Sequence, residues 1–267
     1  MNTLWFYFPN EKNRRLLHGT PADCMRKFQV LEKMEALNEG LEIFLVPAKL
    51  QGINEFEPWF YDKFSKLRYK TVHIADSEDD FLLNSDIFDK LIILQEMLDR
   101  LDVKALIIHA HHFHRGREIT KELLSSALPG IQIYIENNGF DKEWGSNIQD
   151  LEEIFNDCPK YKLCLDIAHV KDFKKSSLKE FLSVESLRCR IEEIHISYST
   201  HFDVEDLYAK RGYPGYSPFH ALWSVIGLSP SEKTKQFIRK YPVVVEGVVP
   251  GEDKYLDFLK HEVELLS

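Results

Sequence analysis

The chain has 267 residues, 44% of them hydrophobic, and a formal net charge of −9. This length suits one α/β barrel, which typically needs about 250 residues. The acidic balance argues against a broad nucleic-acid-binding face, which would have to be basic. No apolar run is long enough to span a bilayer, no signal peptide is evident, and the four cysteines form no C-x-x-C pair, so we expect a cytoplasmic protein with reduced thiols.

Strand-like and helix-like segments alternate along the whole chain. Short runs rich in aromatic and branched residues predict strands at Trp5–Phe8, Leu41–Val46, Thr71–Ala75, Val103–Ala110, Ile131–Ile135, Leu163–Ile167, Ile191–Ile196 and Val243–Val245. Apolar residues at helical spacing predict helices at Ala22–Asn38, Phe56–Leu67, Asp86–Leu101, Glu118–Leu128, Ile148–Phe155, Leu178–Leu187, Phe219–Gly227, Glu232–Lys240 and Lys254–Leu266.

Eight strand–helix units in this order predict a parallel sheet. The simplest closure is a single (β/α)8 TIM barrel that spans residues 1–267. An open doubly wound sheet is the alternative, but it would normally carry a glycine-rich turn after its first strand, and Pro9–Lys12 contains no glycine. A long segment, about 197–218, follows the seventh strand, and it suits either a lid over the site or a contact in a homodimer.

Six consecutive strands end in a residue that can bind a metal. These residues are His73, His109, Glu136, Asp166, His195 and Glu246. Alternation supports the pattern, because Leu163 and Leu165 share one face of their strand and Asp166 takes the other. In a barrel of this type the active site lies at the carboxyl ends of the strands. The six side chains are therefore expected at one mouth.

Carboxylates mixed with imidazoles suit Mn²⁺, Zn²⁺ or Co²⁺, whereas Mg²⁺ and Ca²⁺ prefer oxygen ligands alone. Four of the residues come from four adjacent strands and form one predicted site: Glu136, Asp166, His195 and Glu246. His73 and His109 extend the arc and, with Glu136 as a bridge, could hold a second ion. The expected cofactor is thus one or two divalent transition-metal ions.

Three residues near the same rim are candidates for substrate binding. His111 shares strand parity with His109, whereas His112 and His114 are expected in solvent. Arg115 suits a substrate phosphate or carboxylate, although a salt bridge at a helix start or a free surface charge is the simpler explanation. Trp144 could stack on a sugar face or pack at the rim of the core.

Several of these segments also resemble a known family. They are Ile135–Asn138, Leu165–His169, Glu193–Ile196, Val245–Gly247, Val72–Ala75 and Ile108–Ala110. They look like core motifs of the xylose isomerase-like superfamily, which holds sugar isomerases and epimerases together with endonuclease IV-type (AP endonuclease family 2) apurinic endonucleases. The D-x-x-H pair of Asp166 and His169 is the most specific of them. The resemblance covers strands three to eight.

The resemblance to the isomerase and epimerase branch implies one divalent ion held by the four-residue set. In that branch Glu136 and Glu246 would move a proton on and off the carbon beside a metal-polarised carbonyl. His169 would orient a substrate hydroxyl. The leading expectation is therefore a metal-dependent isomerase or epimerase of a small sugar or polyol ketone, a small-molecule enzyme with no membrane partner.

The resemblance to the nuclease branch implies three zinc ions and a hydrolase of phosphoesters. The third ion would need the equivalent of His169 together with an Asp-x-His pair after the seventh strand. The register chosen here places Leu207 and Ala209 at that pair, and His201–Asp203 offers only a reversed version. The third site is therefore expected to be incomplete. A barrel that binds a ligand without catalysis is a further alternative.

Overall fold

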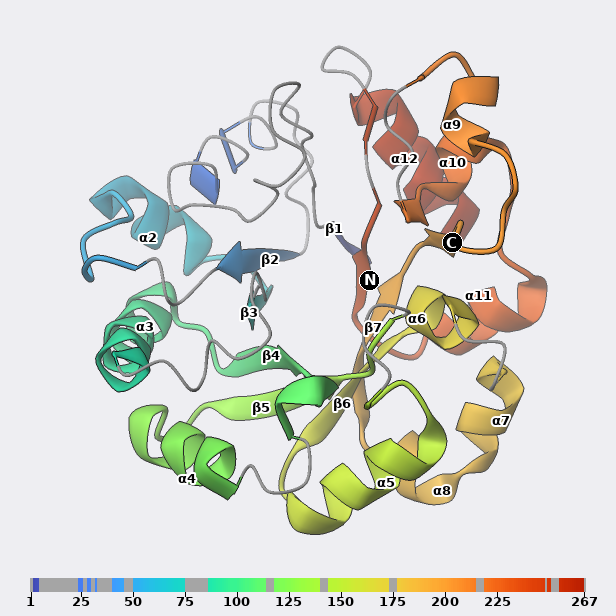
Figure 1. Ribbon diagram of the computed structural model, residues 1–267. Helices are drawn as coiled ribbons and strands as arrows, with labels where there is room; N and C mark the ends of the chain where they lie inside the picture. The colour runs from blue at the N-terminus through green and yellow to red at the C-terminus, as the bar shows by residue number, and fades with distance from the viewer. Residues whose placement is uncertain are drawn as a thin grey trace.

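Eight parallel strands form one sheet, and the helices lie outside it in the computed structural model (Figure 1). The strands are β1 (Asn2–Leu4), β2 (Gly40–Leu45), β3 (Tyr69–Ile74), β4 (Ala105–His109), β5 (Gln132–Glu136), β6 (Lys162–Asp166), β7 (Ile191–Ile196) and β10 (Val243–Val245). The structure describes residues 2–4, 24–25, 28–29, 32, 40–45, 50–74, 86–113, 118–139, 144–172, 177–214, 219–247, 249–250 and 255–266.

The strand order is that of a closed α/β barrel. Each strand pairs in parallel with the next, in the order β1-β10-β7-β6-β5-β4-β3-β2. The two strands at the ends of this order, β1 and β2, contact each other, so the sheet curves round on itself. The predicted (β/α)8 TIM-barrel fold is therefore confirmed.

The helices follow the predicted pattern closely. They are α2 (Pro58–Phe64), α3 (Ile87–Leu101), α4 (Glu118–Ala127), α5 (Ile148–Asp157), α6 (Ile167–Asp172), α7 (Leu178–Ser183), α8 (Glu185–Arg188), α9 (Leu207–Lys210), α10 (Trp223–Ile226), α11 (Glu232–Ile238) and α12 (Tyr255–Leu266). In α3, Leu91, Leu94 and Leu98 recur at helical spacing and are fully buried. That helix is followed by the cap residue Asp102, whose φ of 54° places it in the left-handed region.

Two predicted helices are interrupted. Residues 219–227 begin with a short strand, β9 (His220–Ala221), which pairs antiparallel with β8 (Tyr198–Ser199), and the helix α10 starts only afterwards. The extended backbone of Leu222 separates them. Residues 178–187 form two helices because Val184 is also extended. Pairing across the hairpin is a non-local contact, which helical spacing in the sequence does not report.

Two other expectations lie wholly or largely outside the described residues. The predicted first strand, Trp5–Phe8, is not among them, and of the predicted helix Ala22–Asn38 only five positions are described. The first described strand is instead Asn2–Leu4, which pairs with β10. Across the described part of the chain, no helix has the length and apolarity needed to cross a membrane.

The inside of this barrel is polar where such barrels usually carry Val, Ile and Leu. Along β2, Leu41, Ile43 and Leu45 belong to the apolar core cluster, while Glu42 contacts Thr71 on β3. Glu42 is buried, as is Glu193 on β7. Buried carboxylates are costly unless they are paired or hydrogen-bonded. These two therefore indicate that the barrel interior is built around a charged or polar function.

Candidate metal centre

Strand register brings the six predicted residues together. His109 pairs with Glu136 across β4 and β5, and Asp166 pairs with His195 across β6 and β7. Glu246 directly follows β10, and its N–H donates to the carbonyl of Ile196. Two overlapping groups result, in each of which ligand atoms lie within 4.8 Å of one another. They are His73, His109 and Glu136, and then Glu136, Asp166, His195 and Glu246.

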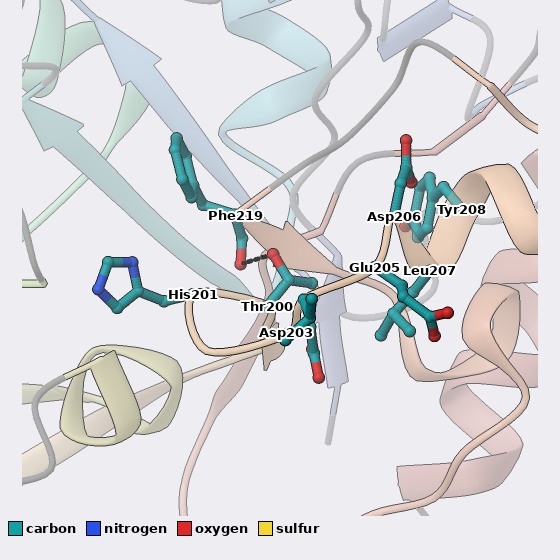
Figure 2. A pocket seen from close by; sticks show the side chains of 9 residues that line it. Thr200, His201, Asp203, Glu205, Asp206, Leu207, Tyr208 and Phe219 are labelled. Atoms are coloured by element: carbon teal, nitrogen blue, oxygen red, sulfur yellow. Dashed lines mark hydrogen bonds between the residues drawn. The ribbon is translucent and has the colours of Figure 1, made fainter.

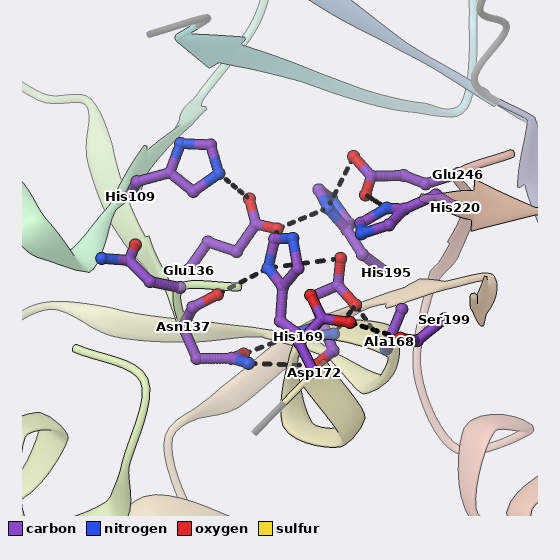
Figure 3. A network of polar contacts seen from close by, with 12 residues as sticks. His109, Glu136, Asn137, Ala168, His169, Asp172, His195, Ser199, His220 and Glu246 are labelled. Atoms are coloured by element: carbon purple, nitrogen blue, oxygen red, sulfur yellow. Dashed lines mark hydrogen bonds and ion pairs between the residues drawn. The ribbon is translucent and has the colours of Figure 1, made fainter. Parts of the chain in front are cut away.

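Glu136 is the residue shared by both groups, and each of its oxygens faces a different side (Figure 3). Its Oε2 lies 3.0 Å from His73 Nε2 and 3.6 Å from His109 Nε2. Its Oε1 lies 3.4 Å from His195 Nδ1 and 3.4 Å from His169 Nδ1. This is the arrangement expected of a carboxylate that bridges two ions.

The two carboxylate oxygens of Asp166 have different surroundings. Its Oδ1 accepts hydrogen bonds from the N–H groups of Ala168, at 2.6 Å, and His169, at 3.0 Å, at the start of α6. Its Oδ2 is buried and has no hydrogen-bond partner among the described residues. The residue therefore caps a helix, as a strand-end aspartate commonly does, and still offers one oxygen to the centre.

His169 is held in a defined orientation at the mouth. Its Nδ1–H donates to the carbonyl of Asn137 at 2.7 Å, so that Nε2 is left for another partner. Gly139 makes room for the ring, because a Cβ there would lie 2.7 Å from His169 Cδ2 and 2.8 Å from Asp172 Oδ2. The side chain of Asp172 accepts a hydrogen bond from Ser199 on β8.

The donor set fits a divalent transition metal. Several of the buried atoms without a hydrogen-bond partner in the described chain lie together here: both carboxylate oxygens of Glu136, Asp166 Oδ2, His195 Nδ1 and His73 Nε2. Polar atoms buried in this way are costly unless something binds them. Imidazole and carboxylate ligands together favour Zn²⁺, Mn²⁺ or Co²⁺. The ligand roles themselves stay predictions.

The surroundings of the centre shift the pKa values of Glu136 and Asp166 in opposite directions. Burial raises the pKa of Glu136, but the imidazoles of His195, His73 and His109 outweigh it and hold that pKa at about 2. For Asp166 burial prevails over His169 and raises the pKa to about 6. A metal ion needs ionised carboxylates. Glu136 is already ionised at neutral pH, and a nearby cation would do most to favour the ionised form of Asp166.

A third group lies beside the first two. It consists of Asp166, His169 and His220, and it combines one buried carboxylate with two partly buried imidazoles. The rings of His169 and His220 have centroids 4.9 Å apart, and His220 Nδ1 lies 3.6 Å from Glu246 Oε2. The predicted register missed His220, because it placed Leu207 and Ala209 here. Those two residues lie in α9, and Ala209 is exposed.

Glu42 and Glu193 were not predicted as site residues, yet both contact the centre from one layer deeper in the barrel. Glu193 Oε1 lies 3.3 Å from His195 Nε2, and Tyr69 donates its hydroxyl to Glu193 Oε2 at 2.6 Å. Glu42 lies 3.3 Å from His73 and 3.4 Å from His195. A single acid within an apolar strand, as in Leu41–Leu45, was the available signal.

The buried Cys164 also falls within ligand distance of Glu136 and His195. Burial raises the pKa of its thiol well above the ordinary value, so the protonated form prevails near neutral pH. A metal ligand must be the thiolate. Cys164 is therefore described more simply as a small residue of the buried core.

The remaining candidates lie farther out or outside the described residues. His111 is partly buried, its Nδ1 lies 3.4 Å from Asn138 Oδ1, and its ring stacks with His109 at 5.9 Å. His112 is fully buried, so the expectation that it lies in solvent is wrong. The ring contact with His111, at 4.1 Å, fixes it inside η3 (Ala110–Phe113). Trp144 packs against the core cluster, and Arg115 is not among the described residues.

A pocket of about 290 Å³ opens beside the β8–β9 hairpin (Figure 2). Asp203, Glu205 and Asp206 line it together with Leu207 and Phe219. Thr200 also lines it and donates its hydroxyl to the carbonyl of Phe219 at 3.2 Å. The pocket is lined by neighbours of His220, but it contains none of the clustered donors, so it is separate from the centre.

Comparison with solved structures supports the fold. Endonuclease IV from Thermus thermophilus is 18% identical, with 99% of this chain and 98% of that chain covered and a TM-score of 0.54. A xylose isomerase-like TIM barrel protein from Mycobacterium smegmatis, in complex with magnesium, is 13% identical, with 93% and 88% covered and a TM-score of 0.57. The chain has the fold of the xylose isomerase-like TIM barrels.

Within this fold the chemistry differs between neighbours. The probable 3-DHS dehydratase AsbF from Bacillus anthracis is 16% identical, with 90% of this chain and 92% of that chain covered and a TM-score of 0.60. No family model matches the sequence, and no curated protein matches it. An endonuclease IV, a probable 3-DHS dehydratase and a xylose isomerase-like TIM barrel protein thus share this fold, and function has to be argued from the side chains.

Proposed function

We propose that the protein is a divalent-metal-dependent hydrolase of phosphoesters with at least two ions at the mouth of the barrel. The observation that supports it best is the position of Glu136, whose two oxygens face two different sets of nitrogens. A centre for a single ion would need only the set around His195. Two bound ions would activate a water molecule and stabilise the attacking and leaving oxygens of a phosphoryl group.

The protein's own residues have separable tasks in this proposal. His73, His109 and Glu136 would hold one ion, and Glu136, Asp166, His195 and Glu246 would hold the other. His169 and His220 lie beside both sets, with ring centroids 4.9 Å apart. They would bind the phosphate oxygens or, with Asp166, a third ion. The comparison with endonuclease IV supports this reading at the level of fold.

The substrate we propose is a small phosphoester rather than a nucleic-acid duplex. A duplex-binding face must neutralise many phosphates with Lys and Arg. This chain carries 43 acidic residues against 34 basic ones. The pocket beside the hairpin is also lined by three acids. Both features favour a compact substrate held by the metal centre itself.

The isomerase or epimerase reading remains the second candidate because all four residues of its single-ion set lie together. It has less support for one reason. Glu136 would have to move a proton, yet it is fully buried, faces His73, His109 and His195, and its pKa is about 2. A general base works best with a pKa near the working pH. Glu246 is the more accessible of the two acids, with a side chain that is 8% exposed, but His195 and His220 outweigh its burial and hold its pKa well below the ordinary value too.

Metal stoichiometry combined with two activity assays tests the proposal. Metal-free protein is titrated with Zn²⁺, Mn²⁺ or Co²⁺, the bound ions are counted by mass spectrometry, and bis(p-nitrophenyl) phosphate and a ketose panel are assayed. We expect two or three ions and phosphoester hydrolysis. One ion at saturation, or isomerised ketose without phosphoester hydrolysis, would overturn the proposal in favour of the second candidate.

A variant pair sharpens this test. His109→Ala removes a donor from the first set alone, and we expect it to lose one ion and at least about 100-fold in hydrolysis. His261→Ala is the matched control, because His261 is exposed on α12 and pairs with Glu264 there. The control should keep the metal content and rate of the wild type. Unchanged metal content in His109→Ala would count against a two-ion centre.

A further inference from the structure

Two glutamates face opposite sides of the same two imidazoles. Glu136 faces His73 Nε2 at 3.0 Å and His195 Nδ1 at 3.4 Å. Glu42 faces the other nitrogen of each ring: its Oε1 lies 3.3 Å from His73 Nδ1, and its Oε2 lies 3.4 Å from His195 Nε2. Each histidine therefore lies between an acid of the proposed metal centre and an acid beneath it.

The contacts of the buried Glu42 carboxylate are directed mainly at these two rings. The Glu42 side chain is fully buried. Among the described residues its ionic contacts are with these two imidazoles, and Thr71 donates its hydroxyl to Oε2 at 2.9 Å. An unpaired carboxylate buried this deeply would be strongly unfavourable. The position is therefore explained if Glu42 accepts hydrogen bonds from both rings.

The chemistry of imidazole predicts which nitrogen of each ring carries the proton. A neutral ring has one nitrogen that donates a hydrogen bond and one that has a lone pair for a metal. An ionised carboxylate can only accept, so a ring beside Glu42 turns its N–H toward Glu42. A histidine that binds a metal usually donates its other N–H to such a partner, which fixes the ring and raises its basicity.

We infer that Glu42 is a positioning residue that orients His73 and His195 together. It accepts Nδ1–H from His73 and shares Nε2–H of His195 with Glu193, and so presents Nε2 of His73 and Nδ1 of His195 to the two ions. One carboxylate thereby imposes opposite tautomers on two ligands that belong to different halves of the centre. The inference rests on the proposed function only in requiring that the centre binds divalent ions.

An alternative role for Glu42 is as a ligand of an ion of its own. Glu42, His73, His195 and Glu246 do offer atoms within 4.8 Å of one another. However, each neutral imidazole has a single lone pair. If His73 and His195 bound an ion beside Glu42, they could not also bind the two ions proposed beside Glu136. Thr71 also occupies one oxygen of Glu42. The positioning role uses every contact without that conflict.

Glu193 provides an internal comparison. It contacts His195 Nε2 at 3.3 Å but shares no contact with His73, and its other oxygen accepts the Tyr69 hydroxyl. Glu192, the next residue back along β7, is exposed and pairs with Lys162 at 3.0 Å. Removing the charge of Glu42 should therefore affect both ions. Removing the charge of Glu193 should affect one ion, and removing that of Glu192 should affect neither.

The first experiment examines the wild-type centre and uses variants only to assign its signals. Zinc-loaded wild-type protein labelled with ¹⁵N-histidine is examined by long-range proton–nitrogen NMR, which reports which ring nitrogen carries the proton. We expect His73 with its proton on Nδ1 and His195 with its proton on Nε2, assigned with His73→Gln and His195→Gln. The same tautomer at both residues, or His73 protonated on Nε2, would overturn the inference.

The second experiment measures Zn²⁺ affinity by chelator competition and the absorption spectrum of Co²⁺-loaded protein. Glu42→Gln should weaken both ions by about 10- to 100-fold and shift the Co²⁺ bands, Glu193→Gln should weaken one ion, and Glu192→Gln should change neither. The melting temperature of each metal-free variant separates this effect from a general loss of stability, which would not alter the Co²⁺ spectrum.

The outcomes distinguish this inference from the proposed function. If Glu42→Gln binds one ion fewer while the others keep their affinity, Glu42 is a ligand and the inference is overturned. Unchanged affinities and spectrum in Glu42→Gln overturn it as well. If hydrolysis is absent but the affinity and tautomer results hold, the proposed function fails and the inference stands. A wild-type protein that binds no divalent ion overturns both.

Discussion

Asn137 and Asp166 exchange two hydrogen bonds across the ends of β5 and β6. Asn137 Nδ2 donates to the carbonyl of Asp166 at 3.0 Å, and Asp166 N–H donates to Asn137 Oδ1 at 2.8 Å. Both residues are fully buried. The pair fixes the backbone at which Asp166 turns from strand to helix, and so fixes the direction of its carboxylate.

Asn137→Ala should therefore weaken metal binding without removing a proposed ligand. We expect Zn²⁺ affinity to fall by about 10- to 100-fold and the free energy of unfolding by about 1–3 kcal/mol, because two buried groups of Asp166 lose their partner. Chelator competition and urea unfolding measure the two effects. Wild-type affinity in a less stable variant would show that the pair serves stability alone.

Gly139→Ala should displace the His169 ring and the Asp172 carboxylate from their present positions. The added Cβ would lie 2.7 Å from the His169 ring and 2.8 Å from Asp172 Oδ2, so both side chains must shift. We expect the hydrolysis rate to fall at least about tenfold while the ion held by His73, His109 and Glu136 is retained. Gly52→Ala is the control, because nothing lies within 4 Å of a Cβ there. Equal rates in the two variants would contradict the role given to His169.

The stability of the metal-free protein should fall as the pH rises from about 6.5 to 9. Burial lowers the pKa of His220, but the carboxylates of Glu246 and Asp166 outweigh it and raise the pKa to about 9 from an unfolded value of 6.5. The charged imidazole therefore stabilises the fold fully below pH 6.5, and this contribution is lost as the pH rises through 9. Urea unfolding of chelated protein across this range measures it.

His220→Gln should flatten that alkaline fall, because Gln does not titrate. Zinc should reverse the trend, since the metal requires neutral imidazoles and binds better as the pH rises. If the metal-free wild type were most stable at pH 9, or if the variant kept the wild-type profile, His220 would not be the group responsible.

Glu262→Ala should destabilise the protein away from the centre. The buried carboxylate of Glu262 on α12 accepts hydrogen bonds from the N–H groups of Trp223, at 3.1 Å, and Ser224, at 2.7 Å, at the start of α10. Their loss should lower the free energy of unfolding by about 2–3 kcal/mol with metal content unchanged. Glu264→Ala, on the exposed face of the same helix, is the control and should change it by less than about 0.5 kcal/mol.

Much of this architecture could be predicted because it is local. Alternating strand and helix patterns imply the barrel, and residues such as His109 and Glu136 can be placed because parallel strands end at one mouth. The same reasoning gives Asp166 and His195. The register of adjacent strands then brings these residues together: His109 pairs with Glu136, and Asp166 pairs with His195.

The features that were missed depend on contacts between distant segments. His220 reaches the centre because β8 and β9 form a hairpin across twenty residues, and the sequence around it favours a helix. Glu42 lies within a strand rather than at its end, and its importance becomes apparent only when His73 and His195 are seen on either side of it. Their roles follow from three-dimensional proximity, which spacing along one strand does not encode.

The sharing of Glu136 between two groups makes the proposed pair of ions one thermodynamic unit. An ion on the His73 side fixes a carboxylate that the His195 side also uses, so occupancy of one half alters the affinity of the other. Such linkage is reciprocal, whichever half loads first. Titrations of this protein should therefore be fitted as cooperative, and a value assigned to either half alone would depend on how full the other half is.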